Sequence, residues 1–238
     1  MKTNHWPALP VDAWEPTYRT IHRWMQIVGK LSIDLCPPMN HWWHSSLRFH
    51  PRGLRTIPLL YDGGALEVTV DFVDHAMTLE TLDARTRLAL GPESVASFYE
   101  RFTGEIRRLG VPAQIWPIPV EIPDPVPFLE DQENASYDRE AIEKMWTILL
   151  HTYRVLAKFR GSFQGKSSPV HFFWGAFDVA VTRFSGRPNP EPPTDKVMGP
   201  AYSHEVISHG FWFGGDWPTG GRVEAPSNAQ VPRSECAS

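Results

Sequence analysis

The chain has 238 residues, of which 42% are hydrophobic, so it is long enough for one domain with a sizeable core. Its formal net charge of -4, without a basic stripe, argues against nucleic acid as a partner, and no apolar run is long enough for a membrane span. The two cysteines, Cys36 and Cys236, are too few for a disulfide framework, and the polar start MKTNHWPALP has no signal-peptide core. We therefore expect a cytoplasmic protein with neither a nucleic-acid nor a membrane partner.

The N-terminal part of the chain predicts one helix and then a strand. Apolar side chains recur at helical spacing over 14–30, and Gly29 is the expected stop before a strand at 31–35. His22 and Gln26 lie one turn apart on this helix, and we interpret them as flanking polar residues rather than ligands. We expect the helix to pack on a sheet.

The next two segments predict most of that sheet. A strand is expected within 40–49, and 53–90 alternates apolar and polar residues between turn signals, as an antiparallel meander does. Asp74 and His75 lie at one of the expected hairpins. There a turn-forming role is favoured over the orientation of a general base.

Two further helices enclose a proline-rich segment. The helices are expected at 93–109 and at about 136–163, each with apolar residues at helical spacing. Between them, prolines recur through 113–125 and predict a stiff, extended wall that carries Glu121 and Asp124. Acids in such a loop are usually solvated, but a stiff backbone is also a good platform for a functional acid.

The longest apolar run, SPVHFFWGAFDVAVTRFSGR at 168–187, contains polar residues that an ordinary core strand would exclude. Read as one continuous strand, the run directs His171 and Asp178 to opposite faces. A two-residue type II′ turn at Gly175-Ala176 would instead set Phe173 opposite Asp178 and make His171 and Asp178 diagonal neighbours on one face. The sequence leaves both readings open.

The C-terminal part predicts one more strand and a tail. The proline-rich loop after 187 is expected to cover or border the site, and 201–212 reads as the last strand. The Gly-, Pro- and Ser-rich segment 215–238 is interpreted as a disordered tail. The sequence therefore predicts a single α+β domain over 6–214, in which a largely antiparallel sheet packs against about three helices.

Five motifs follow one another along the chain: NHWWH, FVDH, WPIPVEIPDPVPF, SPVHFFWGAFDVAVTRFSGR and YSHEVISHGFW. Together they resemble a family of bacterial proteins classed only as a domain of unknown function, over most of 6–214. The resemblance implies that the polar residues of these motifs belong to the family's own pattern, but it implies no reaction, substrate or cofactor. Family members continue with strand-like sequence past GFW, and this chain departs from them at Asp216. An incomplete sheet edge at this point would favour a homodimer.

We expect an enzyme that acts on a small organic molecule by acid-base chemistry, as a hydrolase or as an isomerase or lyase. A histidine beside a carboxylate is the usual device for such chemistry near neutral pH. In this scheme a histidine is the base, a carboxyl group orients it or protonates the substrate, and an arginine holds an anionic group. The corresponding residues are His44 and His171 as bases, Asp178 and Glu121 as acids, Arg183 for the anion, and Trp43, Trp174 and Tyr202 for the substrate.

Two alternatives to this enzyme remain open. No cofactor is predicted, but a divalent metal held by His44, His171 and His204 with a carboxylate would give a metal-dependent enzyme. No ligand pair at diagnostic spacing supports this metal site. The other alternative is a non-catalytic binder, whose aromatic pocket holds a small ligand while the polar residues satisfy one another.

Overall fold

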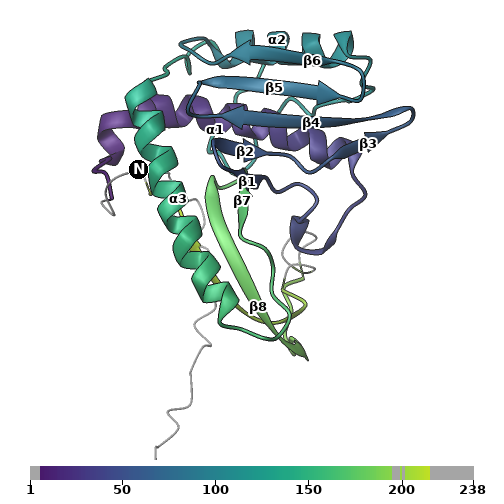
Figure 1. Ribbon diagram of the computed structural model, residues 1–238, viewed down its shortest axis with the longest axis vertical. Coiled ribbons are helices and arrows are strands. Elements are labelled where there is room, and N and C mark those ends of the chain that lie inside the picture. Colours follow the sequence, from purple (N-terminus) through teal and green to yellow (C-terminus); the bar gives the residue numbers. More distant parts are fainter. Residues whose placement is uncertain (1–5, 195–198, 200–201, 215–238) are drawn as a thin grey trace, which may run out of the picture.

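The structure is a computed structural model that describes residues 6–194, 199 and 202–214. Within this range it has three α-helices and two antiparallel sheets (Figure 1). The expected α+β class, with antiparallel pairing and about three helices, is therefore confirmed. The expected tail at 215–238 and part of the proline-rich loop lie outside the described residues.

The first helix, α1 (Val11–Leu35), is longer than the sequence predicts, so the stop at Gly29 and the strand at 31–35 are wrong. Gly29 has a packing role instead, because a Cβ there would lie 2.0 Å from Nε1 of Trp174. The helix ends just before Pro37-Pro38, which cannot continue it. Most of α1 is buried, so this helix forms the centre of the core.

The larger sheet contains the predicted meander. Its strands are β1 (Arg48–His50), β2 (Gly53–Arg55), β3 (Leu59–Tyr61), β4 (Gly64–Asp71), β5 (Ala76–Thr81) and β6 (Arg85–Ala89). They lie in the order β1-β2-β4-β5-β6, and β3 pairs with the first part of β4. The second helix, α2 (Val95–Arg108), packs with α1 against this sheet and is capped by Ser94, whose side chain accepts from the N–H of Ser97.

The strand expected within 40–49 begins only at Arg48. Asn40–Trp42 instead forms a short 3-10 helix, η1. His41 and Trp42 have left-handed backbones, with φ of 58° and 56°, and such a conformation is incompatible with an extended strand.

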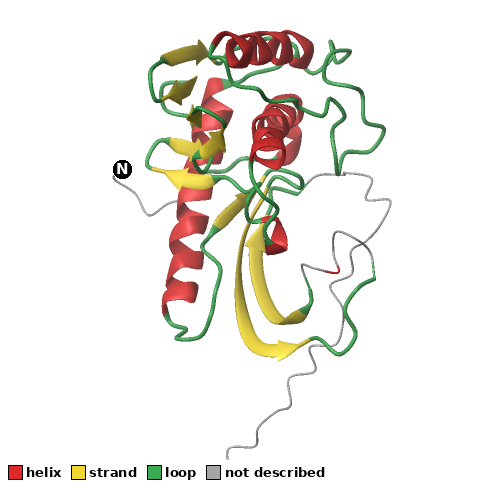
Figure 2. Cartoon of the chain, turned by 90° about the vertical axis from the view of Figure 1, so that its right-hand side faces the viewer, coloured by secondary structure: helices red, strands yellow, loops and turns green. Residues whose placement is uncertain are grey.

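The smaller sheet follows the third helix, α3 (Arg139–Gly161), which Asp138 caps by accepting from two N–H groups of the first turn. Its strands, in the order β7-β8-β9, are β7 (His171–Phe173), β8 (Asp178–Pro188) and β9 (His204–Phe211). Figure 2 shows the long strands of this sheet and the helices in side view. Leu47 and Phe172 exchange backbone hydrogen bonds of 2.8 and 3.1 Å, which join the smaller sheet to the edge of the larger one.

The strands β7 and β8 form a hairpin with the predicted register. Phe173 pairs with Asp178, and His171 pairs with Ala180. The turn itself differs from the type II′ prediction, because the left-handed residue is Phe177, with φ of 55°, and Gly175 does not have a positive φ. The connection is therefore a four-residue turn over 174–177, and His171 and Asp178 share one face.

Candidate functional site

The candidate site is built around the turn of this hairpin, where Glu121 from the proline-rich segment meets Gly175. A Cβ at Gly175 would lie 2.3 Å from Oε1 of Glu121, so the carboxyl group occupies the space that any larger residue would need. Asp178 follows directly after the turn, and the charge of Glu121 acts on it. Two acids that are distant in the sequence are thus brought together.

Burial is the main influence on both carboxyl groups. Burial, and then the nearby charge of Glu121, raises the pKa of Asp178 to about 7. Burial also raises the pKa of Glu121. Within the described part of the chain, no arginine, lysine or histidine forms an ion pair with Asp178. Asp178 therefore changes its protonation state near neutral pH, as a general acid or base must.

The phenol of Tyr18, on α1, belongs to the same environment. Burial, and then the charge of Asp178, raises the pKa of Tyr18 to about 12, so this phenol keeps its proton. Its ring packs edge-on against Phe177, at a centroid distance of 5.1 Å. Tyr18 thus forms an apolar wall next to the acids, with a hydroxyl group that stays neutral.

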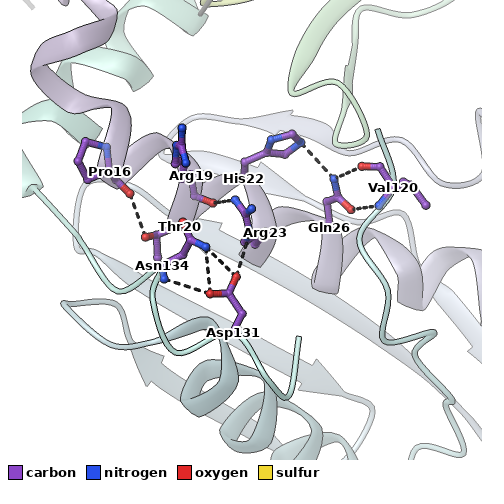
Figure 3. Close-up of polar contacts among 9 residues, drawn as sticks. All are labelled: Pro16, Arg19, Thr20, His22, Arg23, Gln26, Val120, Asp131 and Asn134. Carbon is purple, nitrogen blue, oxygen red and sulfur yellow. Dashed lines mark hydrogen bonds and ion pairs between the residues drawn. The ribbon is translucent and has the colours of Figure 1, made fainter. Parts of the chain in front are cut away.

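One turn of α1 fixes both loops that carry the acids, and Figure 3 shows His22, Gln26 and the contact of Gln26 with Val120. The side chain of Gln26 accepts from the N–H of Val120 at 2.8 Å and donates to its carbonyl at 2.7 Å. Nε2 of His22 lies 2.8 Å from the carbonyl of Gly175 and 3.1 Å from that of Trp174, so this nitrogen must carry the proton and donate. Burial lowers the pKa of His22 to about 4, which keeps its ring neutral at physiological pH.

These two α1 residues are therefore positioning residues, a role that sequence reasoning missed. Gln26 holds the backbone next to Glu121, and His22 holds the turn before Asp178. The available signal was a polar pair at i, i+4 that is flanked by the apolar residues Ile21, Met25 and Ile27. Both side chains are almost fully buried, at 1% and 0% exposure, and buried polar groups need partners.

Backbone strain also gathers around the hairpin. Among the described residues, six other than glycine have a positive φ, and two of them, Glu121 and Phe177, meet at the turn of the hairpin. Each left-handed residue of this kind costs of order 1 kcal/mol, and such strain is most often found at functional sites. The placement of Glu121 against the turn therefore carries a conformational cost as well as an electrostatic one.

His171 lies on the same face as Asp178, farther from the turn. Its side chain is 1% exposed, and the ring of Trp43 packs edge-on at a centroid distance of 5.9 Å. Burial, and then the charges of Arg48 and Arg160, lowers the pKa of His171 to about 3. The structure therefore places a neutral imidazole and an expected substrate contact, Trp43, on the same side of the hairpin as the acids.

His44 and Trp174 hold the 39–45 segment in place. Nδ1 of His44 accepts from the backbone N–H of Met39 at 3.1 Å, so this imidazole is engaged in a local loop. Nε1 of Trp174 donates to the carbonyl of Ser45 at 2.7 Å, and the indole packs on the backbone of α1 at Gly29. Both side chains thus have structural contacts, and burial lowers the pKa of His44.

Arg183 does not face the acids. It lies an odd number of residues from Asp178 on β8, and therefore projects from the opposite face. Its guanidinium group lies 3.5 Å over the ring of Phe159 and donates to the Phe159 carbonyl and to Oγ of Ser162. Arg183 thus closes the C-terminal end of α3.

Tyr202 and His204 lie at the far end of the smaller sheet. His204 pairs with Pro188 at the end of β8, and the carbonyl of Tyr202 accepts from Asn189. The three histidines proposed as metal ligands are therefore not gathered. Across residues 6–194, 199 and 202–214, no group of three or more His, Cys, Asp and Glu side chains could hold a metal ion.

Two surface cavities lie away from the acid pair. One, of about 670 Å³, is lined by α2 and the segment that follows it, including Tyr99, Arg107 and Gln114. Another, of about 340 Å³, lies between the turns at 61–64 and 81–84. Neither is lined by a residue that the sequence analysis selects.

Fold and site together define an α+β protein with two antiparallel sheets and a pair of carboxyl groups, Glu121 and the partly buried Asp178, beside a hairpin. The chain belongs to the family of unknown function DUF5996, whose family model matches residues 6–221. The resemblance inferred from the motifs is thus confirmed. Comparison with curated proteins and with solved structures gave no match. None of the helices in the described ranges combines the length and the apolar character needed to cross a membrane.

Proposed function

We propose that this protein is an enzyme that acts on a small organic molecule by general acid-base catalysis, with Asp178 and Glu121 as the reacting pair. The position of the Glu121 carboxyl group carries the proposal, because it fills the space beside Gly175 next to Asp178. Two adjacent acids, of which Asp178 is partly buried, destabilise a fold when both are ionised. Proteins keep such pairs mainly where a proton must be held or moved.

In the active form, one carboxyl group of the pair would be protonated and the other ionised. The protonated group gives its proton to a carbonyl or leaving oxygen, and the ionised group takes a proton from water or from a carbon atom. Removal of a proton from water leads to hydrolysis, and removal of a proton from carbon leads to isomerisation or elimination. The neutral imidazole of His171 is a second proton acceptor on the same face, because His171 and Asp178 are diagonal neighbours in the hairpin, a spacing of about 7 to 8 Å between backbone positions.

This activity belongs, in our proposal, to the bacterial cytoplasm. The two cysteines of the chain give no disulfide framework, which supports a reducing compartment. The bacterial assignment rests on the motif resemblance described above.

The test is a substrate search followed by substitution of the acids. The full-length protein is incubated with panels of esters, lactones, hydroxy acids and keto acids in D₂O, and proton NMR detects both conversion and exchange of carbon-bound hydrogen. On any active compound, Asp178→Asn and Glu121→Gln should each lower kcat/KM by about 100-fold or more. The exposed Asp83→Asn should leave it unchanged.

Two outcomes would contradict the proposal. The first is full activity of Asp178→Asn on the substrate that the wild type converts. The second is a compound that binds to the protein in a way that depends on Glu121 and Asp178 but is neither converted nor exchanged. That result would make the chain a binding protein.

A further inference from the structure

Arg48 and His171 lie next to each other where the two sheets meet. Leu47 and Phe172 form an antiparallel bridge. The residue after Leu47, Arg48, therefore lies opposite the residue before Phe172, His171. Paired residues direct their side chains to the same face, with Cβ atoms about 4.5 to 5.5 Å apart. Arg48 belongs to the larger sheet and His171 to the smaller one.

Both side chains have buried polar atoms that lack a hydrogen-bond partner among the described residues. Neither Nδ1 nor Nε2 of His171 has a hydrogen-bond partner among the described residues, although the side chain is 1% exposed. Nη1 of Arg48 is also buried without a hydrogen-bond partner in that part of the chain. Native proteins pair nearly all such groups, with protein atoms, water or a ligand. An unsatisfied donor from each of two adjacent side chains therefore indicates something that binds between them.

The surrounding charge determines which kind of ligand fits. Arg160 adds a second guanidinium group near His171, and its Nε donates to the carbonyl of Ser168 at 2.7 Å. Within the described residues, neither Arg48 nor Arg160 forms an ion pair with an acid. A partly buried guanidinium group without a counterion is unfavourable, and an anion would supply the missing charge.

We infer that Arg48 and His171 bind the carboxylate or phosphate group of a small organic molecule. The guanidinium group donates to one oxygen of the anion, and the imidazole N–H donates to another. The rings of Trp43 and Phe173 stand edge-on to His171, at 5.9 and 5.7 Å, and provide an apolar surface for the organic part. That this anion is the substrate of the Asp178 and Glu121 pair rests on the proposed function, whereas the binding site itself does not.

The test measures equilibrium binding of three probes, inorganic phosphate, acetate and benzoate, to the full-length protein by calorimetry. Each probe that binds should bind about tenfold or more weakly to Arg48→Met, since a charge-assisted hydrogen bond is lost. Arg85→Met removes one positive charge at an exposed strand position and should leave binding unchanged. Asp178→Asn should bind at least as tightly as the wild type, which separates this inference from the catalytic proposal.

A spectroscopic measurement on the wild type keeps the inference testable should Arg48→Met not fold. Saturating the protein with the tightest probe should shift the ring ¹⁵N signals of His171 at constant pH, and those of the exposed His204 should stay in place. Tighter binding of benzoate than of phosphate identifies an organic carboxylate as the ligand class, and the reverse order identifies a phosphate ester. Binding that is equal in Arg48→Met and wild type, or no probe that shifts the His171 signals, would overturn the inference.

Discussion

Replacing Asp178 by asparagine should stabilise the protein at neutral and alkaline pH, although it removes a proposed catalytic group. In the folded chain the pKa of Asp178 is about 7, compared with an ordinary value of 3.8. Between these values the folded state binds more protons than the unfolded state. The stability that this proton provides is fully present below about pH 4 and is lost as the pH rises through about 7.

The size of the effect follows from the difference between the two pKa values. A difference of about 3 corresponds to about 4 kcal/mol at 1.36 kcal/mol per unit. Asp178 keeps some contact with water, which solvates the ionised form, so we expect about 2 to 4 kcal/mol. Asparagine has nearly the same shape and cannot ionise. Asp178→Asn should therefore raise the free energy of unfolding by this amount at pH 8 and by much less at pH 4.

Urea unfolding followed by tryptophan fluorescence at pH 4, 6 and 8 measures this difference directly. Asp83→Asn, on an exposed turn, is the matched control and should follow the wild type at every pH. The reasoning would be refuted by an Asp178→Asn variant that is no more stable than the wild type at pH 8. A stabilisation that is equal at pH 4 and pH 8 would refute it as well, because it could not come from ionisation.

Two further substitutions test the packing around α1. Gln26→Leu should lower the free energy of unfolding by about 1 to 3 kcal/mol in urea, because two backbone groups lose their buried partner, whereas the exposed Gln164→Leu should change little. An unchanged urea midpoint in Gln26→Leu would argue against its positioning role. Gly29→Ala should destabilise by about 1 to 3 kcal/mol in thermal unfolding, since its Cβ would overlap Trp174, but Gly104→Ala, where nothing crowds the Cβ, should stabilise by up to about 1 kcal/mol. Equal effects of the two alanines would contradict the close packing on Gly29.

Local patterns predicted most of the fold. The alternation over 53–90 and the helical spacing of α2 and α3 each depend on neighbouring residues, so the elements formed where expected. The hairpin register followed from one of the two readings that the sequence left open, because counting outward from a turn at Gly175-Ala176 fixes which residues pair. The end of α1 was not predictable in this way. Gly29 reads as a stop until the indole of Trp174, distant in sequence, is placed against it.

The residue types of the site could be predicted from the sequence, but which of these residues lie close together could not. Glu121 and Asp178 were selected as acids from their own segments, yet only tertiary structure shows that they meet at the turn. His22 and Gln26 were missed because a polar pair on a helix looks the same whether it faces solvent or holds two buried loops. Arg183 was expected to hold an anionic group of the substrate, but its position on β8 directs it to the end of α3.

The link between Leu47 and Phe172 has a mechanical consequence. Backbone contact between the two sheets there amounts to a single pair of hydrogen bonds, flanked by the cationic Arg48 and the neutral His171. An anion bound between Arg48 and His171 would cross-link the two sheets next to this pair of hydrogen bonds. Ligand occupancy would then stiffen the junction between the sheets, on the hairpin whose turn precedes Asp178.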